Sequence, residues 1–178
     1  MQPSGGTLGE AHWKQAHQII TQAGLAASDI VVLDFDSIET ATASYLKQLL
    51  NPLISPEDPG AETALPSPVL VNVDSKDLRE DITDYLSGKR LALVEATLTK
   101  DKLKLTNVLG TMDGAAKETF SELCELKKAT ALQLYERHRE RTTNQTAWNN
   151  RLFQLVQLRL ARRIRYGRFW IYEPTVTN

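Results

Sequence analysis

The sequence predicts an α/β protein in two parts: an α/β layer over residues 1–110, then a unit of three helices and a β-hairpin over residues 111–178. Two observations support this division. Apolar residues of the first part switch between helical and strand periodicity, which indicates a sheet covered on at least one face by helices. The second part carries three successive helix-start signals and ends in two short strands around a glycine. A length of 178 residues suits one domain or two small ones.

The N-terminal part is expected to contain three helices and four strands. Helices are predicted over residues 12–22, 40–53 and 76–88, because apolar residues recur there at helical spacing. Continuous apolar runs predict buried strands over residues 30–35 and 69–73, and two further strands follow over 90–97 and 102–106. Residues 51–68 hold five of the seven prolines, which predicts a surface loop.

Helix caps organise the C-terminal part. Asp113 is predicted to cap a helix that runs to about residue 127, and Thr130 opens a capping box with Gln133. Thr142-Thr-Asn-Gln145 repeats that form, so a third helix is expected from Thr143 to about residue 159. Its predicted buried stripe consists of Trp148, Leu152, Leu155 and Val156.

A β-hairpin is predicted to follow the third helix. Residues 161–165 and 168–172 are the expected strands, and Tyr166-Gly167 is the expected turn, because glycine permits the positive φ of a tight hairpin. Phe169 and Ile171 are expected to pack beneath the hairpin.

The segment from Asp29 to Leu49 resembles the STAS-like domains, relatives of the sulphate-transporter and anti-sigma-factor-antagonist fold. It has an apolar strand ending in Asp-Phe, a short polar turn and a helix that opens with small residues. The resemblance implies a phosphorylatable hydroxyl near the start of that helix, where Thr40, Thr42 and Ser44 lie. The family's usual Asp-Ser-(Ser/Thr)-Gly run is absent, and helix capping is the competing interpretation of these hydroxyls.

The segment from Thr130 to Tyr172 resembles the winged helix-turn-helix family. Helix, short helix, longer helix and basic hairpin follow one another in that family's order, with Thr142–Leu152 in the place of the recognition helix. The family often has glycine where this chain has Arg159. The resemblance implies binding of double-stranded DNA by the third helix and the hairpin, which is called the wing.

Charge divides along the chain in the same way. Residues 1–110 carry 9 Lys and Arg against 15 Asp and Glu, a net charge of −6, whereas residues 111–178 carry 12 against 7, a net charge of +5. Nine arginines and one acid lie between Arg137 and Arg168. Such a concentration of arginine is typical of nucleic-acid binding, although a solvated helix face or an acidic protein partner is also compatible with it.

Helical geometry selects the residues expected to contact DNA. At 100° per residue, small polar side chains of the third helix point away from its buried stripe, towards the groove of a bound duplex. The wing adds guanidinium groups that suit phosphates. The predicted DNA-binding residues are Thr143, Thr146, Asn149, Asn150, Arg151, Arg163, Arg165 and Arg168.

Signals for other chemistry are missing from the sequence. The glycines lack the spacing of phosphate-binding loops, and the histidines do not cluster with cysteine, so no catalysis, cofactor or metal is expected. Cys124, the one cysteine, lies on an apolar helical stripe and is expected to be an inert core thiol. No membrane span or signal peptide is visible, and a reducing, cytoplasmic setting is the expectation.

The sequence therefore predicts a DNA-binding protein that regulates transcription or recruits a larger machine to DNA. Its N-terminal part is expected to bind a protein partner or to sense a signal. One winged helix recognises only a short half-site, so a homodimer or a larger assembly is expected. The alternative hypothesis is a non-enzymatic adaptor in which both parts bind proteins.

Overall fold

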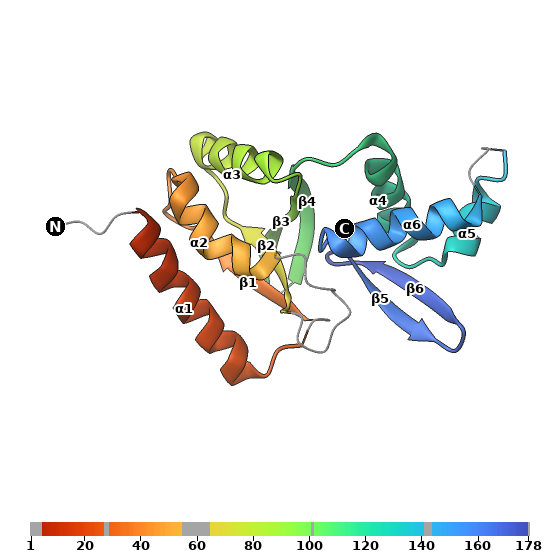
Figure 1. Cartoon of the computed structure of the whole chain (residues 1–178), viewed down its shortest axis with the longest axis horizontal. Coiled ribbons are helices and arrows are strands. Elements are labelled where there is room, and N and C mark those ends of the chain that lie inside the picture. Colours follow the sequence, from red (N-terminus) through yellow and green to blue (C-terminus); the bar gives the residue numbers. More distant parts are fainter. Residues whose placement is uncertain (1–4, 27–28, 55–64, 101, 141–143, 178) are drawn as a thin grey trace.

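The computed structural model describes residues 5–26, 29–54, 65–100, 102–140 and 144–177. Within these ranges the chain is a mixed α/β structure of six helices, a four-stranded sheet and a two-stranded sheet. Figure 1 shows the larger sheet in the middle of the molecule, with the first three helices on one side and the last three on the other. None of the described helices is long and apolar enough to cross a membrane.

The four-stranded sheet is mixed, with its strands in chain order. Strands β1 (Ile30–Asp34), β2 (Ser67–Val71) and β3 (Ala92–Thr99) are parallel, and β4 (Lys102–Gly110) is antiparallel to β3. Parallel neighbours need long crossover connections, which the helices α2 (Ala43–Ile54) and α3 (Lys76–Gly88) supply. The predicted helices and strands of this part are present, with ends displaced by up to seven residues.

One face of this sheet is covered by the first three helices. Leu33, Leu70 and Leu93 of successive strands are buried there against α2, α3 and α1 (Gly5–Ala23). Helix α1 begins seven residues before the predicted start. Helix α2 continues through Pro52 because the next residues, Leu53 and Ile54, are buried in the core, so the predicted loop begins later than residue 51. Residues 55–64 of that loop lie outside the described ranges.

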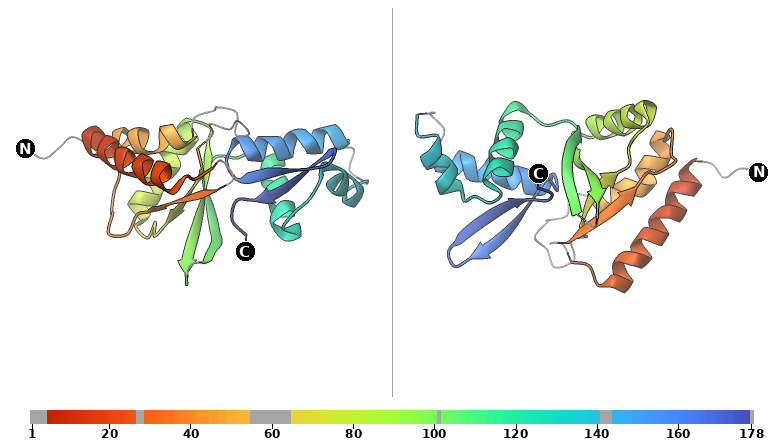
Figure 2. Two further views of the ribbon diagram at one scale, coloured as in Figure 1. Left: turned by 90° about the horizontal axis from the view of Figure 1, so that it is seen from below. Right: turned by 180° about the vertical axis from the view of Figure 1, so that it is seen from behind.

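The opposite face of the sheet contacts the C-terminal part. Val69, Val71 and Val94 on this face belong to one buried cluster with Leu152 and Leu155 of the third C-terminal helix. The end of the chain also reaches the sheet, because the backbone N–H of Leu105 in β4 donates to the carbonyl of Thr177 over 3.2 Å. Figure 2 shows this end of the chain beside β4 in both views.

The C-terminal elements are α4 (Gly114–Leu126), α5 (Ala131–Arg137), α6 (Gln145–Gln157), β5 (Ala161–Tyr166) and β6 (Phe169–Pro174). Two predicted caps are confirmed: the Asp113 carboxylate accepts from the N–H of Ala116, and Thr130 and Gln133 form a complete capping box. The predicted stripe of α6 is fully buried.

Two local predictions were wrong. Helix α6 begins at Gln145, because the side chain of Asn144 caps it by accepting from the N–H of Ala147 over 2.8 Å. The hairpin turn is Gly167-Arg168, since Tyr166 pairs with Phe169. The predicted turn would have set Arg165 opposite Arg168, whereas the observed register sets Arg165 opposite Trp170 and Arg162 opposite Glu173.

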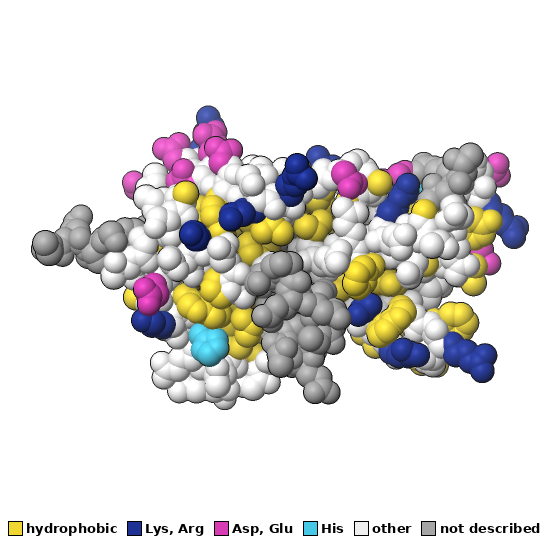
Figure 3. Space-filling view, viewed as in Figure 1, with side chains coloured by type: hydrophobic (Ala, Val, Ile, Leu, Met, Phe, Trp, Pro, Cys, Tyr) yellow, Lys and Arg dark blue, Asp and Glu magenta, His cyan; other side chains and the backbone are white. Residues whose placement is uncertain are grey.

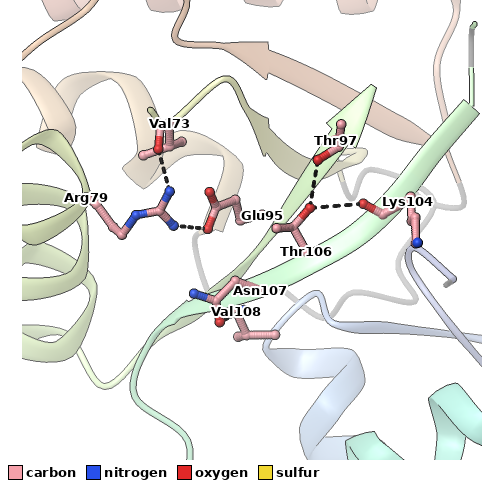
Figure 4. Close-up of polar contacts among 8 residues, drawn as sticks. All are labelled: Val73, Arg79, Glu95, Thr97, Lys104, Thr106, Asn107 and Val108. Atoms are coloured by element: carbon pink, nitrogen blue, oxygen red, sulfur yellow. Dashed lines mark hydrogen bonds and ion pairs between the residues drawn. The ribbon is translucent and has the colours of Figure 1, made fainter. Parts of the chain in front are cut away.

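An ion pair on the helix-covered face fixes α3 to the sheet. Glu95 of β3 is buried, and its carboxylate binds the guanidinium of Arg79 from α3, which also donates to the carbonyl of Val73 (Figure 4). Next to Glu95 the ladder has a β-bulge at Thr106, whose hydroxyl lies 2.9 Å from that of Thr97. The bulge ends the buried part of β3, and the strand continues as an exposed ribbon.

Candidate nucleic-acid interface

Helix α6 presents a short polar edge to solvent. Thr146, Asn149 and Asn150 are exposed, while Trp148 and Leu152 point into the core. The structure thus places these three predicted contact residues on the surface of one helix. The fourth predicted residue at this end, Thr143, lies outside the described ranges.

The side chain of Asn149 joins this polar edge to the hairpin. The hydroxyl of Tyr172 in β6 donates to Asn149 Oδ1 over 3.0 Å. The amide group of Asn149 keeps its two N–H donors for another partner, which suits an acceptor on a base edge. Burial raises the pKa of Tyr172, while the positive charge of Arg163 lowers it to a smaller extent, so this phenol remains a donor at neutral pH.

A stack of rings and guanidinium groups lies between α6 and the hairpin. The guanidinium of Arg163 lies over two rings, 4.9 Å from the centroid of Phe153 and 4.6 Å from that of Trp170. Arg165 lies over the same Trp170 ring, 5.4 Å from its centroid. Cation–π contacts of this kind hold long side chains in one place. Two predicted DNA-binding arginines are therefore held beside the polar edge of α6.

The end of the hairpin carries further positive charge. Arg165 Nε donates to the carbonyl of Gly167 over 3.3 Å, and Arg168 occupies the second position of the turn. Gly167 has a φ of +59°, whereas the φ of Arg168 is negative. This combination is typical of a type II′ turn. Arg162, on the other side of the strand, forms an ion pair with Glu173 over 3.0 Å.

The other described arginines divide between surface and interior. Arg151 lies over the ring of Trp148, with 5.0 Å from the guanidinium carbon to the ring centroid, and Arg139 is exposed. Arg137 binds Glu122 and Glu125, so its charge is neutralised within the protein. Arg159 is only 5% exposed and has a φ of +61°, the left-handed conformation that favours glycine. Fewer arginines of this segment are therefore available to a ligand on the surface than the sequence alone indicates.

The hairpin has two faces of different character. Arg163, Arg165, Trp170 and Tyr172 share the inner face, which meets α6. The outer face carries Ile164, Tyr166, Phe169 and Ile171, which form two directly opposite pairs between the turn and the Arg162–Glu173 pair. The prediction that Phe169 packs beneath the hairpin was wrong, because Phe169 points outward and is exposed. Ile171, on the same face, is half-buried.

Charge is segregated across the molecule. Figure 3 shows acidic side chains gathered over α3 and basic side chains beside hydrophobic ones over the β5–β6 hairpin. Helix α3 itself contains Asp77, Glu80, Asp81 and Asp84, whereas the hairpin contains four arginines and one glutamate between residues 161 and 174. An anion approaching the molecule is therefore drawn towards the hairpin.

A second candidate feature lies in the N-terminal part. A largely apolar cavity of about 300 Å³ lies between α1 and the start of α2, lined by Leu8, His12, Ile38, Ala41 and Tyr45, with Thr40 and Thr42 at its wall. His12 Nδ1 lies 3.0 Å from the hydroxyl of Tyr45. Thr42 Oγ1 accepts from the N–H of Tyr45 and so caps α2, while Thr40 and Ser44 are exposed. Capping therefore accounts for Thr42.

No family model, curated protein or solved structure matches this chain. Among the described residues, the polar edge of α6 and the guanidinium groups stacked beside it are the arrangement most specific for a ligand. Amide and hydroxyl groups match base edges, and guanidinium groups match phosphates.

Proposed function

We propose that this protein binds double-stranded DNA through its C-terminal part, which acts as a winged helix-turn-helix. In this proposal Thr146, Asn149 and Asn150 of α6 contact base edges in the major groove. Arg163, Arg165 and Arg168 of the wing contact phosphates, and Arg151 holds the backbone beside the helix. The mechanism is binding without catalysis, and its biological role is transcription regulation or recruitment of a larger machine. Thr143 remains a predicted contact.

The observation that carries the proposal is the stacked Arg163–Trp170–Arg165 arrangement beside α6. Guanidinium groups that are already held in place lose less side-chain entropy when they bind phosphate than free arginines do. They also lie on the same side of the molecule as the exposed amides of α6, since Tyr172 of the hairpin is hydrogen-bonded to Asn149.

The N-terminal part is proposed to bind a protein partner as a STAS-like module, with its acidic α3 surface and its apolar cavity as candidate contact regions. A homodimer would contact two DNA half-sites at once, which raises its specificity for a target sequence. Thr40 and Ser44 remain the positions at which the STAS-like resemblance implies a phosphate switch, since Thr42 caps α2.

Fluorescence anisotropy of the full chain on a labelled random-sequence duplex tests the proposal. With Arg151, Arg163, Arg165 and Arg168 each neutralising one phosphate, log K against log salt should fall with a slope of about −3 to −4. Arg165→Ala should reduce that slope by about 1 and weaken binding to all sequences alike. Lys76→Ala, which removes an exposed cation of α3, is the matched control and should bind like the wild type.

Base contacts are tested separately, by selecting bound sequences from a random duplex pool. Asn150→Ala should flatten the base preference at one position, equivalent to about 1–3 kcal/mol of lost discrimination. Absence of binding at low salt, or a slope near zero, would instead favour the protein-binding adaptor. Wild-type behaviour of both Asn150→Ala and Arg165→Ala would show that α6 and the wing are not the DNA-binding surface.

A further inference from the structure

The outer face of the β5–β6 hairpin leaves two aromatic rings in solvent. Tyr166 is 73% exposed and Phe169 is 61% exposed, and the strand register pairs them directly across the turn. Ile164, from the next cross-strand pair on this face, is 46% exposed. Single exposed apolar residues are common on protein surfaces, but neighbouring ones on a single face mark a binding surface.

The fold makes no use of these two ring faces. Among the described residues, neither ring stacks on another aromatic ring or lies beneath a guanidinium group. Trp170, on the inner face of the same hairpin, lies instead beneath two guanidinium groups. The outer rings are thus available to a planar ligand from outside the protein.

Charge at the tip of the hairpin selects among possible ligands. Arg168 lies in the turn between the two rings, and Arg165 precedes Tyr166 with its side chain on the inner face. In the described ranges no acidic side chain pairs with either arginine. The only acid of the hairpin, Glu173, is already bound by Arg162 at its other end. A second copy docking through this face would bring two positive clusters together, which opposes self-association. The complementary ligand is therefore planar and anionic.

We propose that Tyr166 and Phe169 form a stacking site for the unpaired bases of a nucleic-acid strand, with Arg168 of the turn on its phosphates. This inference rests on the proposed function, because the strand would continue from a duplex bound by α6. Inside a duplex each base is covered by its neighbours on both faces, so unpaired bases are the ones that offer successive free faces to protein rings. Stacking on exposed rings also tolerates any base sequence. The wing tip then favours junctions between duplex and single strand.

Three probes test this inference on the full chain: a blunt duplex, the same duplex with a ten-nucleotide thymidine tail, and that tail alone. The wild type should bind the tailed duplex at least about five-fold more tightly than the blunt one. Tyr166→Ala and Phe169→Ala should each remove most of this gain and leave blunt-duplex binding unchanged. Ile164→Ala, on the same face but without a ring, is the matched control and should keep the gain.

A spectroscopic readout separates stacking from other contacts. 2-Aminopurine placed in the tail next to the duplex should lose fluorescence on binding the wild type and Tyr166→Phe, but not the double variant lacking both rings. All substituted side chains lie on the surface, so circular dichroism melts should coincide with those of the wild type.

The outcomes separate the two proposals. Blunt-duplex binding with no gain from the tail would overturn the stacking site and leave the proposed function standing. Loss of binding to every probe would overturn the proposed function and the stacking site together. A dimer in analytical ultracentrifugation that dissociates in Tyr166→Ala would also overturn the stacking site, because a second copy would then occupy this face.

Discussion

At the scale of single residues, Trp170 organises the inner face of the hairpin. Its ring is covered by Arg163 and Arg165 of the neighbouring strand and also packs against the buried apolar cluster, so cation–π contacts add to apolar packing on this face. The sequence shows that arginines and aromatic residues alternate here. It does not show which ring meets which cation, because a shift of the strand register changes every pair.

Cys124 provides a prediction about chemical reactivity. Its thiol is half-buried against the apolar cluster, and burial raises its pKa from 9.0 to about 11. The reactive thiolate at pH 8 should therefore be about a hundred-fold scarcer than for an ordinary thiol. We expect Ellman's reagent to modify native Cys124 very slowly at pH 8 and the unfolded chain rapidly. Fast, stoichiometric modification of the native protein would contradict this burial.

At the scale of elements, polar N-cap residues predicted the start of a helix correctly where only one residue could act as the cap. Asp113 and Thr130 cap α4 and α5 as expected. Thr142-Thr-Asn-Gln145 offers three capping residues in a row, and Asn144 is the one that caps α6. Likewise, Gly167 indicated a hairpin, but a glycine fits a turn at Tyr166-Gly167 as well as one at Gly167-Arg168. The second turn is observed, and its register places Glu173 opposite Arg162.

The cap at Asp113 links two helices and yields a stability prediction. Its carboxylate accepts from Ala116 N–H over 2.7 Å and from Gln154 Nε2 of α6 over 3.0 Å. These two bonds, the first being the larger cause, lower the pKa of Asp113. Asp113→Ala should cost about 1 kcal/mol of unfolding free energy at pH 7, measured by urea denaturation.

The pH dependence of this cap follows from the direction of the shift. A carboxyl whose folded pKa is lowered stabilises the fold above its unfolded pKa, here 3.8, and loses that contribution as the pH falls through the folded value. Asp113→Asn keeps the acceptor oxygen and serves as the control, which should lack this acid-dependent loss. Equal stability of Asp113→Ala and the wild type at pH 7 would show that the cap contributes nothing.

At the scale of the whole molecule, the four-stranded sheet is covered on both faces by different parts of the chain. The apolar run Val69–Val73 predicted a buried strand, and the order of elements predicted helices on at least one face of the sheet. What covers the second face could not be predicted, because that contact joins residues far apart in sequence, such as Val94 and Leu155. The division of the chain at residue 110 remains a prediction about folding units.

One buried apolar cluster joins the sheet to the C-terminal helices and predicts how the molecule unfolds. Because Val94 of the sheet and Trp148 of α6 both belong to it, unfolding of the sheet should expose apolar side chains of the C-terminal helices, and the reverse. In a Trp13→Phe/Trp170→Phe variant, fluorescence of the remaining Trp148 and far-UV circular dichroism should report the same urea midpoint. Two separated midpoints would show that the sheet and the C-terminal helices unfold independently.

The hydrogen bond between Leu105 and Thr177 has a consequence for solubility. β4 is an edge strand of the sheet, and edge strands offer unpaired backbone groups to which strands of other molecules can add. By accepting from the amide of Leu105, the last described residue of the chain occupies part of that edge, and the neighbouring Val176 is buried against the core. Val176 and Thr177 thereby shield part of this edge from strand addition.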